Sequence, residues 1–279
     1  METVAIVGVG LIGGSFALGL REAGFGGRIL GVSSPPTLEA ALARGVVDEG
    51  KELEEAVAAA DLVYLAHEIG RILEALPRVA AAARPGTLVT DAGSTKAAIV
   101  ARAEKLFGQG VIFLGGHPMA GKAERGVEAA EAGLFRGATY VLTPVGGEWP
   151  AAAVVEEFRG WLVRLGAWVT VRDPQEHDRI VAFTSHLAQL ASTALAAVVG
   201  NQTAGGEDWR ISGGGLRDMT RLARSSYDLW RDICLTNSTP LDQALSVYIQ
   251  KLEHLRHNLR ERELEREFQQ GAALAEKLR

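Results

Sequence analysis

The sequence predicts an α/β fold, with a mostly parallel sheet covered by helices on both faces, followed by an all-helical domain. Short apolar segments alternate with helical patterns from Val4 to Val171, as in successive strand–helix–strand units. The chain opens on an apolar strand, a glycine-rich turn and a helical segment. Beyond Arg172 we find only helical patterns. We therefore expect two domains, 1–172 and 173–279.

The first strand–helix unit carries Gly8, Gly10 and Gly13 in G-x-G-x-x-G spacing. In this context the first glycine permits a tight turn, the second lets a pyrophosphate approach the backbone, and the third lets helix and strand pack closely. The helix-forming segment Phe16–Leu20 follows. Free N–H groups at the start of the helix favour the anion, and Leu11 and Ile12 are expected beside it. The pattern predicts a Rossmann-type dinucleotide-binding domain, with all of these residues at the cofactor.

The other elements of the sheet are predicted from apolar runs and helix signals. The expected strands are Arg28–Val32, Asp61–Ala66, Gly86–Thr90, Val111–Leu114, Tyr140–Thr143 and Ala167–Val171. The expected helices are Leu38–Arg44, Ile69–Ala83 with Pro77 interrupting, Ala97–Leu106 and Ala153–Leu165. Asp173 as N-cap, Pro174 at N1 and Glu176 at N3 predict the start of the helical domain.

Composition and charge restrict the class of protein. With 47% hydrophobic and 23% charged residues the chain is an ordinary globular protein, and a net charge of −5 argues against nucleic acid as a partner. One cysteine, Cys234, excludes an intrachain disulfide and a cysteine-based metal cluster, so we expect no metal. A reducing, cytoplasmic compartment fits this composition. Because the first strand follows the N-terminus directly, we expect no signal peptide.

The apolar segment Val181–Val199 approaches the length of a membrane span. It contains polar residues, and we interpret it as a helix buried inside the protein, with no membrane contact. One face at helical spacing contains Asp178, Ala182, Ser185, His186 and Gln189, so its polar residues form one stripe. This stripe is expected to face the ligand cleft; the alternative is an internally satisfied polar network.

A seam of apolar residues in the last part of the chain predicts helix–helix packing. Its members recur at spacings of three and four residues and are Leu245, Tyr248, Leu252, Leu255 and Leu259. A long helix of this kind in a small helical domain favours a subunit interface, because obligate dimers commonly share a hydrophobic helical core. We expect a homodimer through the helical domain.

The carboxyl ends of parallel strands form the ligand-binding edge of such a sheet, so the loops that follow the strands should converge on one cleft. After the second strand, Ser33 and Ser34 stand where an acidic residue normally bonds the ribose of NAD. Loss of the carboxylate removes repulsion against a 2′-phosphate, which favours NADP. No arginine follows Ser34, so NAD and NADP both stay open.

Two of these loops carry candidate catalytic groups. His117 lies in GGHPMAG, where glycines allow close approach of a ligand, and is a candidate general base or hydrogen-bond acceptor. The loop DAGSTK contributes the hydroxyl of Ser94. Lys96 in the same loop is either functional or a structural cation.

The helical domain carries a run of three glycines, Gly213–Gly215, for which we find no packing use. It predicts a backbone folded around a ligand. Arg217, Arg221 and Arg224 follow, and their guanidinium groups suit a carboxylate. Spacing does not fix which arginine points to the ligand.

At this point the residues resemble the prephenate/arogenate dehydrogenase family of tyrosine biosynthesis. The similar motifs are GVGLIGGS, VTDAGSTK, GGHPMAG, TYVLTP, EHDRIVAFTSHLAQ, SGGGLRDMTRLARS and LWRDI, in family order. The resemblance implies NAD(P)-dependent oxidative decarboxylation of prephenate to 4-hydroxyphenylpyruvate, or of arogenate to tyrosine. Hydride leaves the ring carbon that bears the hydroxyl, CO₂ departs, and the ring becomes aromatic. From the end at Arg279 we expect neither a fused mutase nor a regulatory module.

The resemblance also implies roles for individual residues. His117 resembles the residue that polarises the substrate's 4-hydroxyl, and Ser94 resembles the serine that supports that hydroxyl and the nicotinamide. Arg221 is similar to the arginine that binds a substrate carboxylate. Asp178 and Trp230 resemble a gate at the mouth of the site.

The substrate side chain is expected near His186, Gln189 and Gly214, where His186 matches the first histidine of the family's SHLPH stretch. Gln189 replaces the second histidine, and a neutral amide suits either a keto acid or an amino acid, which leaves the substrate open. His67 lies where the family has a proline-containing turn; it either touches the cofactor or is simply exposed, and we favour exposure.

Two competing interpretations share the domain layout. A β-hydroxyacid dehydrogenase or imine reductase is one; the hydroxyacid enzymes carry a catalytic lysine on the long interdomain helix, whereas Glu176–Gly200 contains none. A dinucleotide-sensing dimer is the other, and it predicts no need for His117 together with Arg221.

Overall fold

The computed structural model describes residues 1–108, 110–203, 208–260 and 264–278. The chain divides into two compact units. The first comprises Met1–Ile180 and Arg224–Asn237, and the second comprises Val181–Ala223 and Ser238–Arg279. The helix that follows Arg172 therefore lies almost wholly in the first unit. The domain division at Arg172 stays a prediction.

The first unit is organised around one eight-stranded sheet with the order β3-β2-β1-β4-β5-β6-β7-β8. Its strands are β1 (Thr3–Val7), β2 (Arg28–Val32), β3 (Glu49–Gly50), β4 (Leu62–Leu65), β5 (Leu88–Asp91), β6 (Ile112–Pro118), β7 (Thr139–Pro144) and β8 (Trp168–Val171). All neighbouring strands are parallel except β6 and β7. The order from β3 to β6 is that of a doubly wound dinucleotide-binding sheet, which confirms the predicted fold class.

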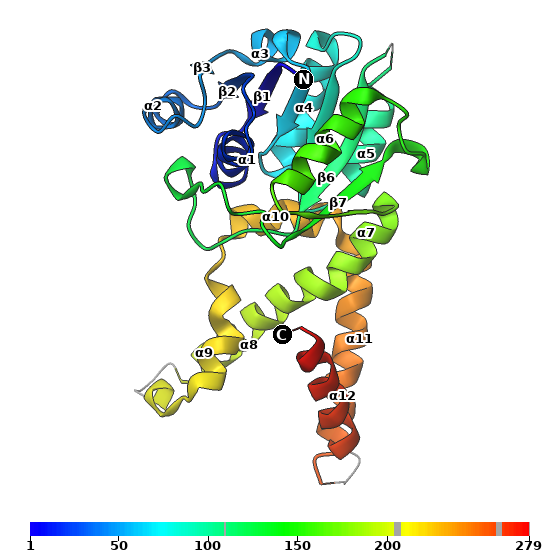
Figure 1. Ribbon diagram of the computed structural model, residues 1–279. Coiled ribbons are helices and arrows are strands. Elements are labelled where there is room, and N and C mark those ends of the chain that lie inside the picture. Colours follow the sequence, from blue (N-terminus) through cyan, green and yellow to red (C-terminus); the bar gives the residue numbers. More distant parts are fainter. Residues whose placement is uncertain (109, 204–207, 261–263, 279) are drawn as a thin grey trace. The chain divides into compact units, whose positions relative to one another are not determined.

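Helices cover both faces of this sheet (Figure 1). The helices of the first unit are α1 (Leu11–Glu22), α2 (Pro35–Ala43), α3 (Leu53–Ala59), α4 (Ile69–Ala82), α5 (Ala97–Glu104), α6 (Ala153–Arg164), α7 (Pro174–Val181) and α10 (Tyr227–Thr236), with short helices η1 (Val127–Ala129) and η2 (Val145–Gly147). In β1, Val4 and Ile6 join a core with α1 and α6, whereas Ala5 and Val7 join one with α3, α4 and α5. Alternate side chains point to opposite faces, so the central strands are apolar throughout.

Three elements differ from the sequence expectations. α1 begins at Leu11, so Gly13 lies inside the helix. Pro77 does not interrupt α4, because Ile72, Leu76 and Val79 bury the helix against the sheet and this packing offsets the lost backbone hydrogen bond. β6 continues through His117 to Pro118, beyond the expected end of the strand.

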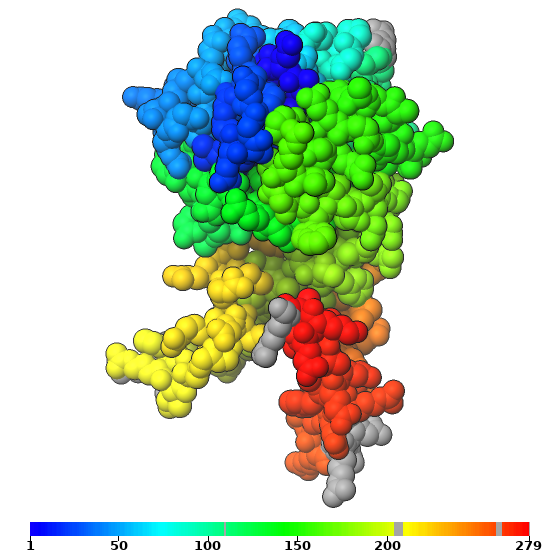
Figure 2. Space-filling model, in the orientation of Figure 1, coloured from blue at the N-terminus to red at the C-terminus, as the bar shows by residue number. Residues whose placement is uncertain are grey.

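The second unit is helical. It consists of a π-helical segment η3 (Ala182–His186), α8 (Leu187–Gln202), η4 (Asp208–Ile211), α9 (Gly214–Thr220), the first part of η5 (Arg221–Arg224), α11 (Ser238–His257) and α12 (Leu264–Lys277). Figure 2 shows α12 (red) beside α11 (orange), and Lys251 Nζ lies 2.8 Å from Glu267 Oε2 between them. No strand occurs among the described residues beyond Val171, as expected.

The helical run Pro174–Gln202 is long and apolar enough to cross a membrane by length and composition. Within one chain only a stripe of it is buried. His186, Gln189 and Ser192 lie on that stripe, whereas Val198 is 59% exposed. Burial inside the protein is thus only partial within one chain, where much of the apolar surface of this helix faces outward.

Candidate active site

The glycine-rich turn between β1 and α1 has the geometry of a dinucleotide site. Gly8 has a φ of +97°, and a Cβ there would lie 2.6 Å from the carbonyl oxygen of Ala66. A Cβ at Gly13 would lie 2.1 Å from the Gly8 carbonyl oxygen, so this glycine permits close packing of α1 on β1. A Cβ at Gly10 would meet no described atom within 4 Å. Gly10 thus leaves room for the pyrophosphate that the motif accommodates.

Gly10 is the N-cap of α1 and supplies no capping side chain. The N–H groups of the first turn, at Leu11 and Ile12, have no acceptor within the helix. Together with the dipole of α1 they suit an anion. The chain therefore fits a dinucleotide pyrophosphate at this turn.

A cavity of about 260 Å³ adjoins the carboxyl ends of β1 and β2. Its lining residues are Val7, Val32, Glu52, Leu53, His67, Arg71, Glu74, Ala75 and Arg78. This edge of the sheet is where the fold binds the adenosine half of a dinucleotide. The side chain of His67 is only 26% exposed, and burial lowers its pKa, so the expectation that His67 is simply exposed is wrong.

The loop after β2 carries the predicted serines at the start of α2. Ser34 is the N-cap of α2, and its Oγ lies 2.9 Å from Thr37 Oγ1. Prolines 35 and 36 occupy the first turn, and since proline has no N–H they weaken this helix end as an anion site. Ser33 is half-buried. The serine hydroxyls are thus the polar groups that this loop can offer to a ribose.

His117 lies on β6, opposite Val141 of the antiparallel neighbour β7, and is 8% exposed. The two preceding glycines are required by packing. A Cβ at Gly116 would lie 2.6 Å from the Asp91 carbonyl oxygen, and one at Gly115 would lie 2.3 Å from Thr143 Oγ1. The expected reason for these glycines, room for a ligand, is therefore replaced by close strand packing.

A buried ion pair holds the backbone that precedes His117. Lys96 donates to Asp91 and, at 2.8 Å, to the carbonyl oxygen of Gly116, and both charged side chains are fully buried. The N–H of Gly116 donates to Asp91 Oδ1 at 3.2 Å. Burial lowers the pKa of Lys96, and the Asp91 carboxylate opposes that shift. Lys96 is thus a structural cation that, together with Asp91, fixes both backbone groups of Gly116.

Ser94 is half-buried in the turn between β5 and α5. The turn is held from both sides. Gly93 N donates to Asp91 Oδ2 at 2.8 Å, and Thr95 Oγ1 lies 2.7 Å from Thr236 Oγ1 of α10. The hydroxyl of Ser94 is therefore presented by a fixed loop at the carboxyl edge of the sheet.

Sequence reasoning missed His177, which is 2% exposed and lies on α7. Its Nε2 lies 2.8 Å from His117 Nδ1, and its Nδ1 lies 2.8 Å from Asp178 Oδ1. The N-cap contacts of Asp173 start α7 as predicted, with Gln175 N and Glu176 N donating to Asp173 Oδ1 at 2.9 and 3.0 Å. The sequence feature that came nearest to indicating His177 is the adjacent Asp178, which was predicted to lie at the site.

Asp178, expected in a gate, is 2% exposed and caps α5 from outside that helix. Lys96 N donates to its Oδ1 at 2.7 Å and Ala97 N to its Oδ2 at 2.9 Å. Asn237 Nδ2 donates to its backbone carbonyl at 2.9 Å. These contacts give Asp178 a positioning role; its gating role stays a prediction.

Trp230 lies on α10 and packs against the same core as α4. Asp232, on the same helix, fixes α10 against α4. Its Oδ2 accepts a hydrogen bond of 2.8 Å from Gly70 N in the first turn of α4. Arg231 donates to the other carboxylate oxygen at 3.0 Å. The expected gate residue is therefore held on a capped helix of the first unit.

In the second unit, His186 ends the π-helical segment η3 and is 1% exposed. A π-segment adds a residue to a turn, which changes the angular register between the residues before and after it. Gln189 Nε2 donates to the Leu222 carbonyl at 2.9 Å and to Thr193 Oγ1 at 3.2 Å. Ser192 Oγ accepts a hydrogen bond from Ala223 N at 3.2 Å. α8 thus positions the segment that carries Arg221.

Arg221 begins η5 and is exposed, as are Arg217 and Arg224. Gly214 is the first residue of α9, so the glycine run starts a helix instead of interrupting one. A Cβ at Gly213, Gly214 or Gly215 would meet no described atom within 4 Å. Among the described residues, close packing therefore does not explain why these three positions are glycine.

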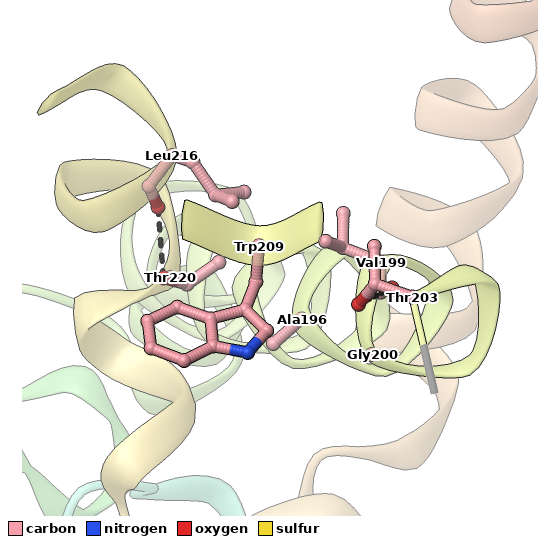
Figure 3. Close-up of a pocket in the computed structure, with 7 residues that line it drawn as sticks. All are labelled: Ala196, Val199, Gly200, Thr203, Trp209, Leu216 and Thr220. Atoms are coloured by element: carbon pink, nitrogen blue, oxygen red, sulfur yellow. Dashed lines mark hydrogen bonds between the residues drawn. The ribbon is translucent and has the colours of Figure 1, made fainter. Parts of the chain in front are cut away.

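The second unit also contains a hollow of about 500 Å³, drawn in Figure 3. It is lined by Ala196, Val199, Gly200, Thr203, Trp209, Leu216 and Thr220. Thr220 Oγ1 donates to the Leu216 carbonyl at 2.8 Å, so this polar group is satisfied within α9. No lining residue is one of the predicted site residues.

Comparison with known families covers both halves of the chain. Residues 16–169 match the family described as prephenate dehydrogenase, nucleotide-binding domain, and residues 173–273 match prephenate dehydrogenase, dimerization domain. A prephenate dehydrogenase of Lactococcus lactis is 34% identical over 271 residues, which are 94% of this chain and 70% of that protein.

Two solved structures are similar over the whole chain. Prephenate dehydrogenase of Aquifex aeolicus, in complex with hydroxyphenyl propionate and NAD+, has a TM-score of 0.92 and 30% identity, covering 100% of this chain and 99% of that one. Arogenate dehydrogenase of Synechocystis has a TM-score of 0.83 and 32% identity, covering 100% of both chains.

Proposed function

The chain belongs to the prephenate dehydrogenase family, and we propose that it oxidatively decarboxylates prephenate to 4-hydroxyphenylpyruvate in tyrosine biosynthesis, using NAD or NADP. The observation that carries the proposal is His117, a buried histidine held by a second histidine at the carboxyl edge of a dinucleotide-binding sheet. The family membership of both halves of the chain supports it.

In this reaction NAD(P)⁺, when bound, supplies the hydride acceptor. His117 accepts the hydrogen bond of the substrate's 4-hydroxyl as the C4–H bond transfers its electron pair, so that the C–O bond gains double-bond character. Loss of CO₂ then returns electrons to the ring, and the oxygen regains its proton as the ring becomes aromatic. Ser94 supports the same hydroxyl and the nicotinamide. Since the product is aromatic, the protein mainly has to align the reactants.

A substrate with two carboxylates needs a fixed cation, and we assign Arg221 to one of them because a guanidinium binds a carboxylate in bidentate fashion. His186, Gln189 and Gly214 are assigned to the substrate side chain. Asp178 and Trp230 are retained as a proposed gate, although a gating movement of Asp178 would have to break its capping contacts with α5.

Arogenate is the second candidate substrate, and Gln189 leaves it open. Its amide donates to Leu222 and Thr193 and carries no charge, so it does not select a keto acid over an amino acid by electrostatics. The similarity to an arogenate dehydrogenase fits this alternative.

A homodimer through the helical domain is part of the proposal, because residues 173–273 match a dimerization domain. Exposed apolar side chains of α8 and α11 need cover in water; they include Val198 (59%), Val247 (54%), Ile249 (52%) and Leu252 (46%). Burial against a partner subunit would also explain the apolar surface of the helical run Pro174–Gln202 without a membrane. We propose a cytoplasmic location, because the single cysteine fits a reducing compartment. Sedimentation velocity is expected to give twice the chain mass; a monomer would refute the dimer.

The deciding experiment is an absorbance assay for reduced cofactor with prephenate or arogenate, each with NAD⁺ or NADP⁺. Turnover of prephenate supports the main proposal, and turnover of arogenate only supports the alternative. No reduction with any pair would refute both. The Arg221→Leu variant is expected to raise KM for substrate at least about tenfold, whereas Arg71→Leu, at the cofactor side, leaves it unchanged.

A further inference from the structure

Three buried side chains of the first unit form a line that ends at His117. Asp178 Oδ1 lies 2.8 Å from His177 Nδ1, and His177 Nε2 lies 2.8 Å from His117 Nδ1. The two imidazole rings are 5.1 Å apart between centroids and inclined at 70°. Asp178 and His177 are each 2% exposed.

The direction of the hydrogen bonds follows from the carboxylate end. An ionised carboxylate only accepts hydrogen bonds, so His177 Nδ1 carries the proton in its contact with Asp178. In the neutral imidazole the other nitrogen, Nε2, is then an acceptor. His117 Nδ1 must therefore be the donor to His177. That leaves the Nε2 of neutral His117 with the lone pair of the ring.

We propose that His177, itself oriented by Asp178, is a positioning residue that fixes His117 as the Nδ1–H tautomer. In that tautomer it is Nε2 of His117 that accepts the hydroxyl proton of the substrate. The catalytic consequence rests on the function proposed above, whereas the tautomer itself does not. His177 has no direct part in the reaction; it acts through the ring of His117.

The ends of the line are rigidly held, which a positioning role requires. Asp178 accepts hydrogen bonds from two backbone N–H groups at the start of α5. At the other end, His117 belongs to a paired strand, and the Lys96–Asp91 ion pair holds the backbone of the preceding Gly116. The Asp178 carboxylate cannot turn without breaking its contacts, and the backbone that carries His117 is fixed.

When the hydroxyl proton moves onto His117 Nε2, the ring becomes an imidazolium with both nitrogens protonated. Its Nδ1–H still donates to His177, and the negative charge of Asp178 lies beyond that ring. The proton returns to the phenolic oxygen at the end of the reaction, so no proton is lost along the line. The arrangement follows the logic of a carboxylate–histidine pair that holds a base in one tautomer.

The test uses two amide variants of His177 that separate its two contacts. His177→Asn places an amide donor near Asp178 but offers His117 no acceptor. His177→Gln places a carbonyl oxygen near the position of Nε2 and so restores an acceptor to His117. We expect kcat to fall about 10- to 100-fold in His177→Asn, with KM for cofactor unchanged, and to recover in part in His177→Gln. His257→Asn, an exposed histidine of α11, is the control and should match the wild type.

The tautomer is read independently of turnover by long-range ¹H–¹⁵N correlation of the histidine rings in the substrate-free protein at neutral pH. The resonances of His117 are assigned by their loss in His117→Gln. In the wild type we expect protonated Nδ1 and unprotonated Nε2, and in His177→Asn a shift toward the Nε2–H form. A wild type with protonated Nε2 would overturn the proposal, as would a fall in kcat without any change of tautomer.

The two readouts separate this inference from the proposed function. If no substrate is turned over but the Nδ1–H tautomer is found and depends on His177, the assigned reaction fails and the positioning role holds. If prephenate is turned over but the tautomer does not depend on His177, only the positioning role fails.

Discussion

Lys96 and Asp91 form an ion pair from which water is fully excluded. Removing one partner of such a pair leaves an uncompensated buried charge. We expect Lys96→Met to lower the free energy of unfolding by about 3–5 kcal/mol. Denaturant unfolding measures this. Lys96→Met combined with Asp91→Asn should recover most of the loss.

The exposed pair of Arg78 and Glu54, with Nε 2.6 Å from Oε1, is the matched control for the buried pair. Surface ion pairs contribute little because water and salt screen them. The free energy of unfolding of Arg78→Met should therefore be close to that of the wild type. If Lys96→Met were no less stable than Arg78→Met, the buried Lys96–Asp91 ion pair would not contribute to the stability of the fold.

The glycine turn gives a prediction that separates folding from cofactor binding. Gly10→Ala should keep the melting temperature of the wild type, because its Cβ meets no described atom within 4 Å, but weaken cofactor binding at least about tenfold. Gly13→Ala should instead lower the melting temperature, since its Cβ would overlap the Gly8 carbonyl. Gly26→Ala, exposed and equally uncrowded, is the control for both measurements. Unchanged cofactor affinity in Gly10→Ala would contradict the assignment of the turn.

Gln189 gives a prediction about substrate binding. In Gln189→Ala the Leu222 carbonyl loses its partner, and the segment that carries Arg221 loses a contact with α8. We expect KM for the substrate to rise about tenfold, with KM for cofactor unchanged. Gln202→Ala, at the exposed end of the same helix, should leave both constants unchanged. An equal rise of both constants would point to a general loss of structure.

Asp61 gives a pH prediction. Burial raises its pKa, but hydrogen bonds from Glu2 N and Thr3 N outweigh this, so the pKa lies below its usual value. Such a carboxyl stabilises the fold above its unfolded pKa of about 3.9 and ceases to do so as pH falls through the folded value. Asp61→Asn should therefore have a lower melting temperature than the wild type at pH 7. The difference in melting temperature should shrink toward pH 3. A difference that is independent of pH would contradict this.

The sheet was predictable because buried parallel strands are short apolar runs, and Arg28–Val32 matches β2 at both ends. α3 and β3 were missed: β3 has two residues and is defined by its pairing with β2, which no local pattern shows. The antiparallel pairing of β6 with β7 was likewise invisible, since strand direction depends on the path of the chain.

The site was predicted in part. The glycine turn was identified because its spacing follows directly from backbone sterics. His177 was missed because it lies outside the stripe that begins at Asp178, and only the fold brings it to His117. The π-helical segment before α8 depends on tertiary packing and leaves no mark on apolar periodicity. The roles of His117, Ser94 and Arg221 stay predictions.

The chain leaves and re-enters its first unit, which contains both Met1–Ile180 and Arg224–Asn237. Asp178 and Asp232, both beyond the last strand, cap α5 and α4. A polypeptide cut at Arg172 would keep every strand yet expose two uncapped helix ends and lose His177. The nucleotide-binding half is therefore not expected to survive limited proteolysis as an independent fragment with native stability.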